Sequence, residues 1–151
     1  MKRLNKDTRL YNVIFPFWSL LFVPKTWLIV LPANFVIDSF VLFVSLWALG
    51  IDEIIGYFKR HIFKVFAFGM LADILGAIYL FFMSSVDNIG KTVGWTFVTV
   101  TAIVIAAVLI FLFNYFITFR KLEKQERCKL SLIFALVTAP YTYLMPSHWL
   151  I

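Results

Sequence analysis

The 151-residue chain is poor in charge and in cysteine. Charged residues make up only 15% of it, whereas soluble domains average about 25%. The one cysteine, Cys128, excludes an intramolecular disulfide, a CxxC redox pair and a cysteine metal cluster. The polar stretches between its apolar runs are short, so the sequence predicts no attached soluble catalytic domain.

Apolar side chains dominate the sequence instead. Hydrophobic residues make up 62% of the chain, which includes 18 Phe, 6 Tyr and 5 Trp. A water-soluble fold of this size could not bury so much apolar surface. The runs are continuous rather than alternating, which favours helices over a membrane barrel. The predicted fold is therefore an all-α polytopic membrane bundle that forms a single transmembrane domain over residues 1–151.

Five runs are candidates for membrane spans, since a span needs about 20 apolar residues. They cover residues 10–23, 27–49, 62–83, 93–119 and 130–145. The first run is short and could be re-entrant or interfacial instead. The last contains Pro140. Residues 51–61 place four apolar side chains on one helical face, so we expect a short helix on the membrane surface there.

The basic residues predict the orientation of the five spans. With the N-terminus inside, 12 of the 14 Lys and Arg residues fall on the inner side, and only Lys25 and Lys91 fall outside. Membrane proteins concentrate basic residues in cytoplasmic loops. This distribution predicts an inside N-terminus, an outside C-terminus and a multi-pass protein of a bacterial-type cytoplasmic membrane. It also explains the net charge of +6 without a nucleic-acid partner.

Two acidic residues lie near the centres of their predicted membrane spans. Asp38 is 11 residues from each end of the run 27–49, and Asp73 is 11 residues after Ile62 and 10 before Met83. An acidic side chain at the centre of a membrane helix costs about 2.5–3.5 kcal/mol on insertion scales. The two runs are consecutive and antiparallel, so the carboxyls should reach the same depth, where they could meet if the helices pack face to face.

The neighbours of these carboxyls extend the candidate site. Asn34, Asp38 and Ser45 form one polar stripe of the second run. Gly69 and Gly76 flank Asp73 on one face of the third, and such small residues let another helix approach closely. Asp, Asn and Ser offer the hard oxygen atoms that bind cations.

Two neighbouring carboxyls in a site without water can avoid carrying two unpaired negative charges in three ways. They share a proton, bind a cation, or pair with a basic group. No Lys or Arg of this chain lies at the middle of a predicted span, which favours a proton or a small cation. The alternative is that the two acids only hydrogen-bond neighbouring helices, a contact worth about 0.6 kcal/mol on average in membranes.

These features predict a small proton- or cation-coupled transporter, or a subunit of a channel or transporter, with Asp38, Asp73, Asn34 and Ser45 at its site. The alternative is a scaffold or accessory subunit whose polar residues serve helix packing. Ser39 and Ser45 have no adjacent base that would make either a nucleophile, so no enzyme is predicted. No cofactor or metal is expected. Because five helices are few for a complete pathway, we expect a homo-oligomer or a larger membrane complex.

Overall fold

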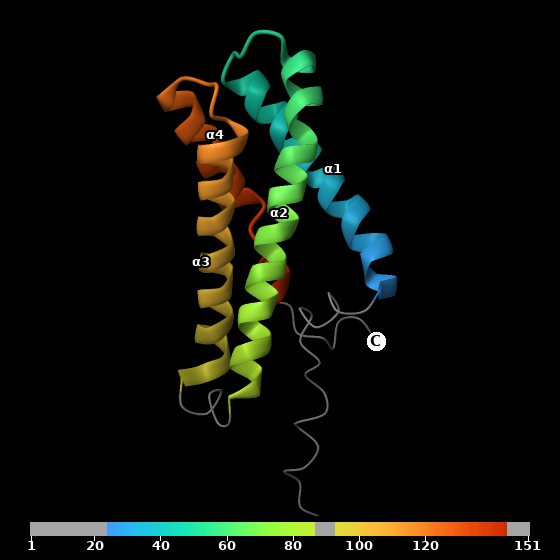
Figure 1. The fold of residues 1–151 in the computed structure, drawn as a ribbon, viewed down its shortest axis with the longest axis vertical. Coiled ribbons are helices and arrows are strands. Elements are labelled where there is room, and N and C mark those ends of the chain that lie inside the picture. The colour runs from blue at the N-terminus through green and yellow to red at the C-terminus, as the bar shows by residue number, and fades with distance from the viewer. Residues whose placement is uncertain (1–23, 87–92, 145–151) are drawn as a thin grey trace, which may run out of the picture.

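The computed structural model of the chain describes residues 24–86 and 93–144, and all regular structure within these ranges is helical (Figure 1). The elements are α1 (Pro24–Ala48), α2 (Ile54–Ser85), α3 (Trp95–Phe113), the π-helix η4 (Asn114–Thr118), α4 (Lys124–Val137) and the 3-10 helix η5 (Tyr141–Leu144). The first predicted span, residues 10–23, lies outside the described residues, as do both chain ends.

Three of these helices are long and apolar enough to cross a membrane. They are Trp27–Ala48 in α1, the whole of α2, and Trp95–Thr118, which joins α3 to η4. The first and third agree closely with the predicted spans 27–49 and 93–119, and α2 contains the predicted span 62–83. The protein is therefore an all-helical bundle with membrane-spanning character.

The turn between α1 and α2 begins at a glycine, as the sequence indicates. Gly50 has φ +66°, and the amides of Gly50 and Ile51 donate to the carbonyls of Trp47 and Leu46. This is the Schellman pattern, in which a left-handed residue satisfies the last carbonyls of a helix. The expected separate helix over 51–61 is absent, because residues 54–61 form the first turns of α2. Ile54 and Tyr57 pack on the same core as the rest of that helix, which keeps it continuous.

The predicted fifth span, residues 130–145, is not one continuous helix. α4 has 14 residues, which corresponds to about 21 Å of length, against a hydrocarbon core of about 30 Å. It ends at Val137, and η5 follows a short non-helical break. Pro140 has no backbone N–H, so the helix cannot continue through it with a normal bond to the Leu136 carbonyl. Among the described helices, α4 is therefore too short to cross the bilayer alone.

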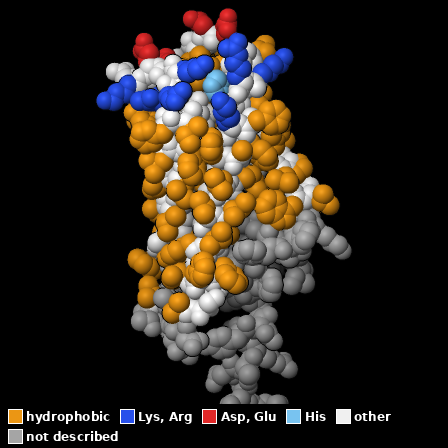
Figure 2. All heavy atoms as spheres, in the orientation of Figure 1, with side chains coloured by type: hydrophobic (Ala, Val, Ile, Leu, Met, Phe, Trp, Pro, Cys, Tyr) orange, Lys and Arg blue, Asp and Glu red, His pale blue; other side chains and the backbone are white. Residues whose placement is uncertain are grey.

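Charged side chains gather at one end of the bundle, where α1 ends, α2 begins, and η4 turns into α4 (Figure 2). The basic residues of these segments are Lys59, Arg60, Lys64, Arg120, Lys121, Lys124, Arg127 and Lys129. The sides of the bundle are apolar (Figure 2). We call the end of the bundle that carries these basic residues the charged end. The structure thus brings together the two described loops that the sequence assigns to one side of the membrane.

The interior is divided into two apolar clusters. The cluster nearer the charged end includes Val41, Leu42 and Leu46 of α1 together with residues of α2, α3 and α4 and with Phe119, which follows η4. The second cluster joins α2 and α3 to Ala139 and Tyr143, and no residue of α1 belongs to it. α1 accordingly leans away from the bundle towards its N-terminal end (Figure 1).

Candidate functional site

A cavity of about 430 Å³ lies between α1, α2 and the segment where α4 breaks into η5. We call it the midplane cavity, because Asp38 and Asp73 lie near the middle of their helices. Its lining residues come from three elements: Ile29, Val30, Ala33, Asn34, Ile37 and Asp38 of α1, Gly69 and Asp73 of α2, and residues 137–143. Three of the four predicted site residues, Asn34, Asp38 and Asp73, therefore share one cavity.

Asp38 is buried at the wall of this cavity, with 5% of its surface exposed. A Cβ atom added to Gly69 would lie 3.5 Å from Asp38 Oδ2, so the carboxyl packs directly against the α2 backbone. The small residue permits this approach, as the sequence predicts for that face of α2. Within the described ranges, the Asp38 carboxyl has no hydrogen-bond or ion-pair partner.

Asp73 is linked to α1 through Asn34. Asn34 Nδ2 donates to Asp73 Oδ2 at 3.5 Å and lies 3.3 Å from Met70 Sδ. The other carboxyl oxygen, Asp73 Oδ1, is buried and has no hydrogen-bond partner. An unpaired buried acceptor is costly unless a ligand, a proton or water satisfies it. Asp73 therefore retains an unfilled acceptor at the cavity.

The two carboxyls do not lie directly opposite each other, as the sequence suggested they could. Asp38 faces Gly69, four residues before Asp73, and Asn34, four residues before Asp38, reaches Asp73. The acids are thus staggered by one turn, about 6 Å along the helices. The predicted start of the span at residue 62 lies inside α2, so counting from that start did not give the register of α2 against α1. Asn34 fills the position between them.

Ser45 is buried but does not line the midplane cavity. It lies seven residues beyond Asp38, about 10 Å closer to the charged end. Its neighbours in α1 belong to the apolar cluster there. The predicted polar stripe is present along α1, yet only its first two members reach the site.

The end of α4 and the break after it line the same cavity as the acids. Both the amide and the hydroxyl of Thr138 donate to the Phe134 carbonyl. The Tyr141 hydroxyl donates to the carbonyl of Leu136, which Pro140 leaves without its usual donor. The carboxyl end of a helix carries a partial negative charge. The segment that closes the cavity therefore adds to the negative potential of the two aspartates.

Tyr143 holds this segment against α2. A Cβ added to Gly76 would lie 3.2 Å from Tyr143 Cε2 and 3.4 Å from the Ala102 carbonyl, so Gly76 provides the space for the ring. The Tyr143 hydroxyl donates to the backbone carbonyl of Asp73. Tyr143 is a positioning residue that the sequence interpretation missed. Pro140 inside an apolar run is the one signal that indicated a break near the midplane.

The described walls of the midplane cavity offer no basic side chain to balance its two acids. No Lys, Arg or His is among its described lining residues, and no group of three metal-binding side chains occurs in the residues that the structure covers. The polar lining side chains are two carboxyls, the Asn34 amide and the hydroxyls of Thr138 and Thr142, and the remaining walls are apolar or aromatic. Two carboxyls without a basic neighbour favour a positively charged ligand, but this set does not provide the ligand number of a structural metal centre.

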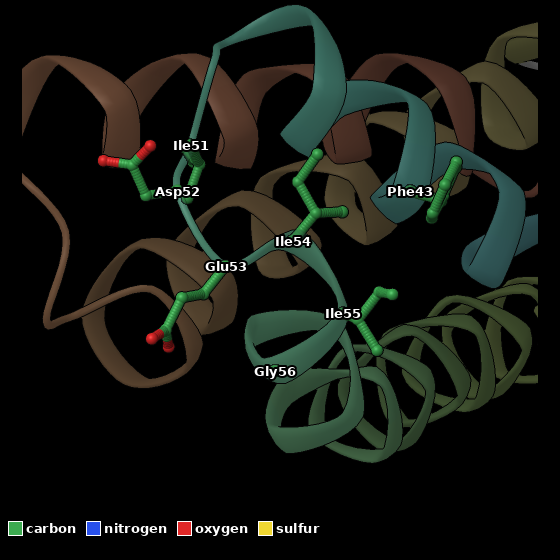
Figure 3. Close-up of a pocket in the computed structure, with 7 residues that line it drawn as sticks. All are labelled: Phe43, Ile51, Asp52, Glu53, Ile54, Ile55 and Gly56. Atoms are coloured by element: carbon green, nitrogen blue, oxygen red, sulfur yellow. The ribbon is translucent and has the colours of Figure 1, made fainter.

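A second hollow lies at the charged end and is lined by Phe43 of α1 and residues 51–56 (Figure 3). The carboxylates of Asp52 and Glu53 lie on one side of it, and Phe43, Ile54 and Ile55 lie on the other (Figure 3). Both acids are exposed, and no buried unpaired group points into the hollow. It is therefore a surface feature rather than a second candidate site.

Comparison with known proteins adds no assignment. No family model, no curated protein and no solved structure matches this chain.

Proposed function

We propose that the protein is a small proton- or cation-coupled membrane transporter, or a subunit of a channel or transporter, that uses Asp38 and Asp73 with Asn34 to hold the ion. The observation that carries this proposal is one cavity lined by the buried Asp38 and the half-buried Asp73, with an unpaired buried acceptor on Asp73 and no basic residue among its described lining. Acids inside a membrane are costly and typically mark ion pathways. Discontinuous helices at midplane depth are also typical of transporter sites.

The proposed setting is a multi-pass protein of a cytoplasmic membrane with the charged end facing the cytoplasm. The eight basic residues at that end support this orientation. Three described helices can cross the membrane, and these are few for a complete pathway. We therefore propose a homo-oligomer or a larger complex in which other helices complete the route.

The second candidate is a scaffold or accessory subunit. The contact from Asn34 to Asp73 favours it, since that hydrogen bond joins α1 to α2. Helix packing alone does not account for the rest of the site, because Asp38 has no partner in the described residues and Asp73 Oδ1 is unpaired. A purely structural acid would be satisfied on both sides.

The test is ion flux in proteoliposomes that contain a pH-sensitive dye and an imposed membrane potential. Asp38→Asn and Asp73→Asn keep the size of each side chain but remove the negative charge. We expect each to reduce protein-dependent flux to the level of empty liposomes. The matched control is Asp52→Asn, the same change at an exposed residue of the charged end, which should leave flux unchanged.

Size-exclusion profiles and circular dichroism accompany each variant. Well-folded Asp38→Asn and Asp73→Asn proteins that retain full flux would refute the proposal. Loss of the fold in both variants would favour the scaffold, because the acids would then be needed for packing.

A further inference from the structure

The midplane cavity is much larger than an ion requires. Its volume is about 430 Å³, and a water molecule takes about 30 Å³ of liquid, so the space equals roughly 14 waters. Pockets that hold organic ligands begin at about 300 Å³. A proton or a bare metal ion on the acids would leave most of this volume unfilled.

The walls around the acids fit an apolar body. Ile29, Val30, Ala33 and Ile37 contribute aliphatic surface from α1, and Pro140 contributes it from the opposite side. Tyr141 and Tyr143 add aromatic rings, whose faces attract organic cations. The cavity thus combines a negative region with apolar and aromatic walls.

The cavity also borders the surface that faces lipid in a membrane. Of its lining residues, Ile29 is 74% exposed, Val137 53% and Tyr141 51%. A ligand that partitions into the bilayer could therefore approach sideways between α1 and the end of α4. This favours an amphiphilic ligand over a strongly hydrated one.

We propose that the midplane cavity binds an amphiphilic organic cation, with its ammonium group at Asp38 and Asp73 and its apolar body against α1 and the α4–η5 break. This inference rests on the proposed function and names the substrate class of the same site. Asn34 contacts one oxygen of Asp73, and the other oxygen has no hydrogen-bond partner in the described residues.

Benzyltrimethylammonium is a suitable probe because its positive charge is permanent and independent of pH. Its radiolabelled form is titrated against the full chain in nanodiscs of neutral phosphatidylcholine, which avoids adsorption to anionic lipid. We expect saturable binding that neopentylbenzene, the neutral isostere with carbon in place of nitrogen, does not displace. Displacement by the isostere at equal concentration would overturn the inference, and this measurement needs no variant.

Variants then locate the bound probe. Asp38→Asn removes the charge, and Ala33→Phe fills the cavity from α1; each should weaken binding at least tenfold. The controls are Asp52→Asn and Ala67→Phe, the same changes at exposed residues outside the cavity, which should bind as the unmodified protein does. Undiminished binding in folded Asp38→Asn or Ala33→Phe would overturn the inference, as would equal loss in the controls.

The failure of this inference is distinguishable from failure of the proposed function. Asp-dependent ion flux without saturable binding of benzyltrimethylammonium would overturn the organic substrate and keep ion transport. Asp38-dependent binding without any flux would support the substrate class and contradict transport. Displacement of the probe by an equal concentration of Na⁺ would also overturn the inference, because the site would then prefer a small inorganic ion.

Discussion

Gly76 and Gly69 lie on the same helix but in different surroundings, which yields a quantitative prediction. A Cβ at Gly76 would lie 3.2 Å from Tyr143 Cε2 and 3.3 Å from its hydroxyl oxygen. At Gly69 the nearest atom is Asp38 Oδ2 at 3.5 Å, an ordinary van der Waals contact. Gly→Ala at both positions therefore compares the same chemical change with and without a steric conflict.

The expected free energies follow from opposing effects. Replacing glycine by alanine inside a helix gains about 0.8–1.0 kcal/mol of helix propensity. At Gly76 the added methyl group overpacks the Tyr143 ring, which costs about 1–3 kcal/mol, and displaces a hydrogen bond worth about 1 kcal/mol. We expect Gly69→Ala to stabilise the protein slightly and Gly76→Ala to destabilise it, with a difference of about 2–4 kcal/mol between them, because the propensity gain is common to both.

The measurement is reversible unfolding by SDS in mixed micelles, followed by far-ultraviolet circular dichroism. A double variant, Gly76→Ala with Tyr143→Ala, provides the decisive control because it removes the ring that the new methyl group meets. In that background the Gly76→Ala cost should disappear, and the difference measures the coupling of the two residues. Equal effects of Gly69→Ala and Gly76→Ala, or an unchanged cost without Tyr143, would refute the packing of η5 on α2.

Two further substitutions test other contacts. Tyr143→Phe keeps the ring and removes only the bond to the Asp73 carbonyl, so the free energy of unfolding should fall by about 1 kcal/mol in the same SDS assay; an unchanged value would contradict that bond. Leu42 is completely buried, whereas Phe40 is 70% exposed on the same helix. Leu42→Ala should cost about 2–5 kcal/mol, and Phe40→Ala much less; the reverse order would contradict the assigned inner face of α1.

The sequence predicted the long helices well because each depends on one local property. An uninterrupted apolar run must satisfy its own backbone in lipid, and Gly50 marks where α1 ends. The small residues flanking Asp73 also predicted close approach, which Gly69 and Gly76 both show. These features need no knowledge of which segments contact each other.

The register of α2 against α1 and the break between α4 and η5 were harder to predict from the sequence. The depth of Asp38 against Asp73 depends on how α1 packs on α2, and residues 51–61 resembled a separate surface helix although residues 54–61 belong to α2. Pro140 signalled a break, but nothing in the sequence indicated that Tyr143 would return to Gly76 and close a cavity. Such contacts between distant segments are decided by tertiary packing rather than by local pattern.

The divergence of α1 separates the part of the helix that holds the bundle together from the part that walls the cavity. Val41, Leu42 and Leu46 anchor it near the charged end, while Ile29 and Ile37 touch the cavity and no described core cluster. If the cavity binds a ligand as proposed, substitutions at Ile29 and Ile37 would alter its selectivity with little loss of folding energy and without compensating changes elsewhere in the chain.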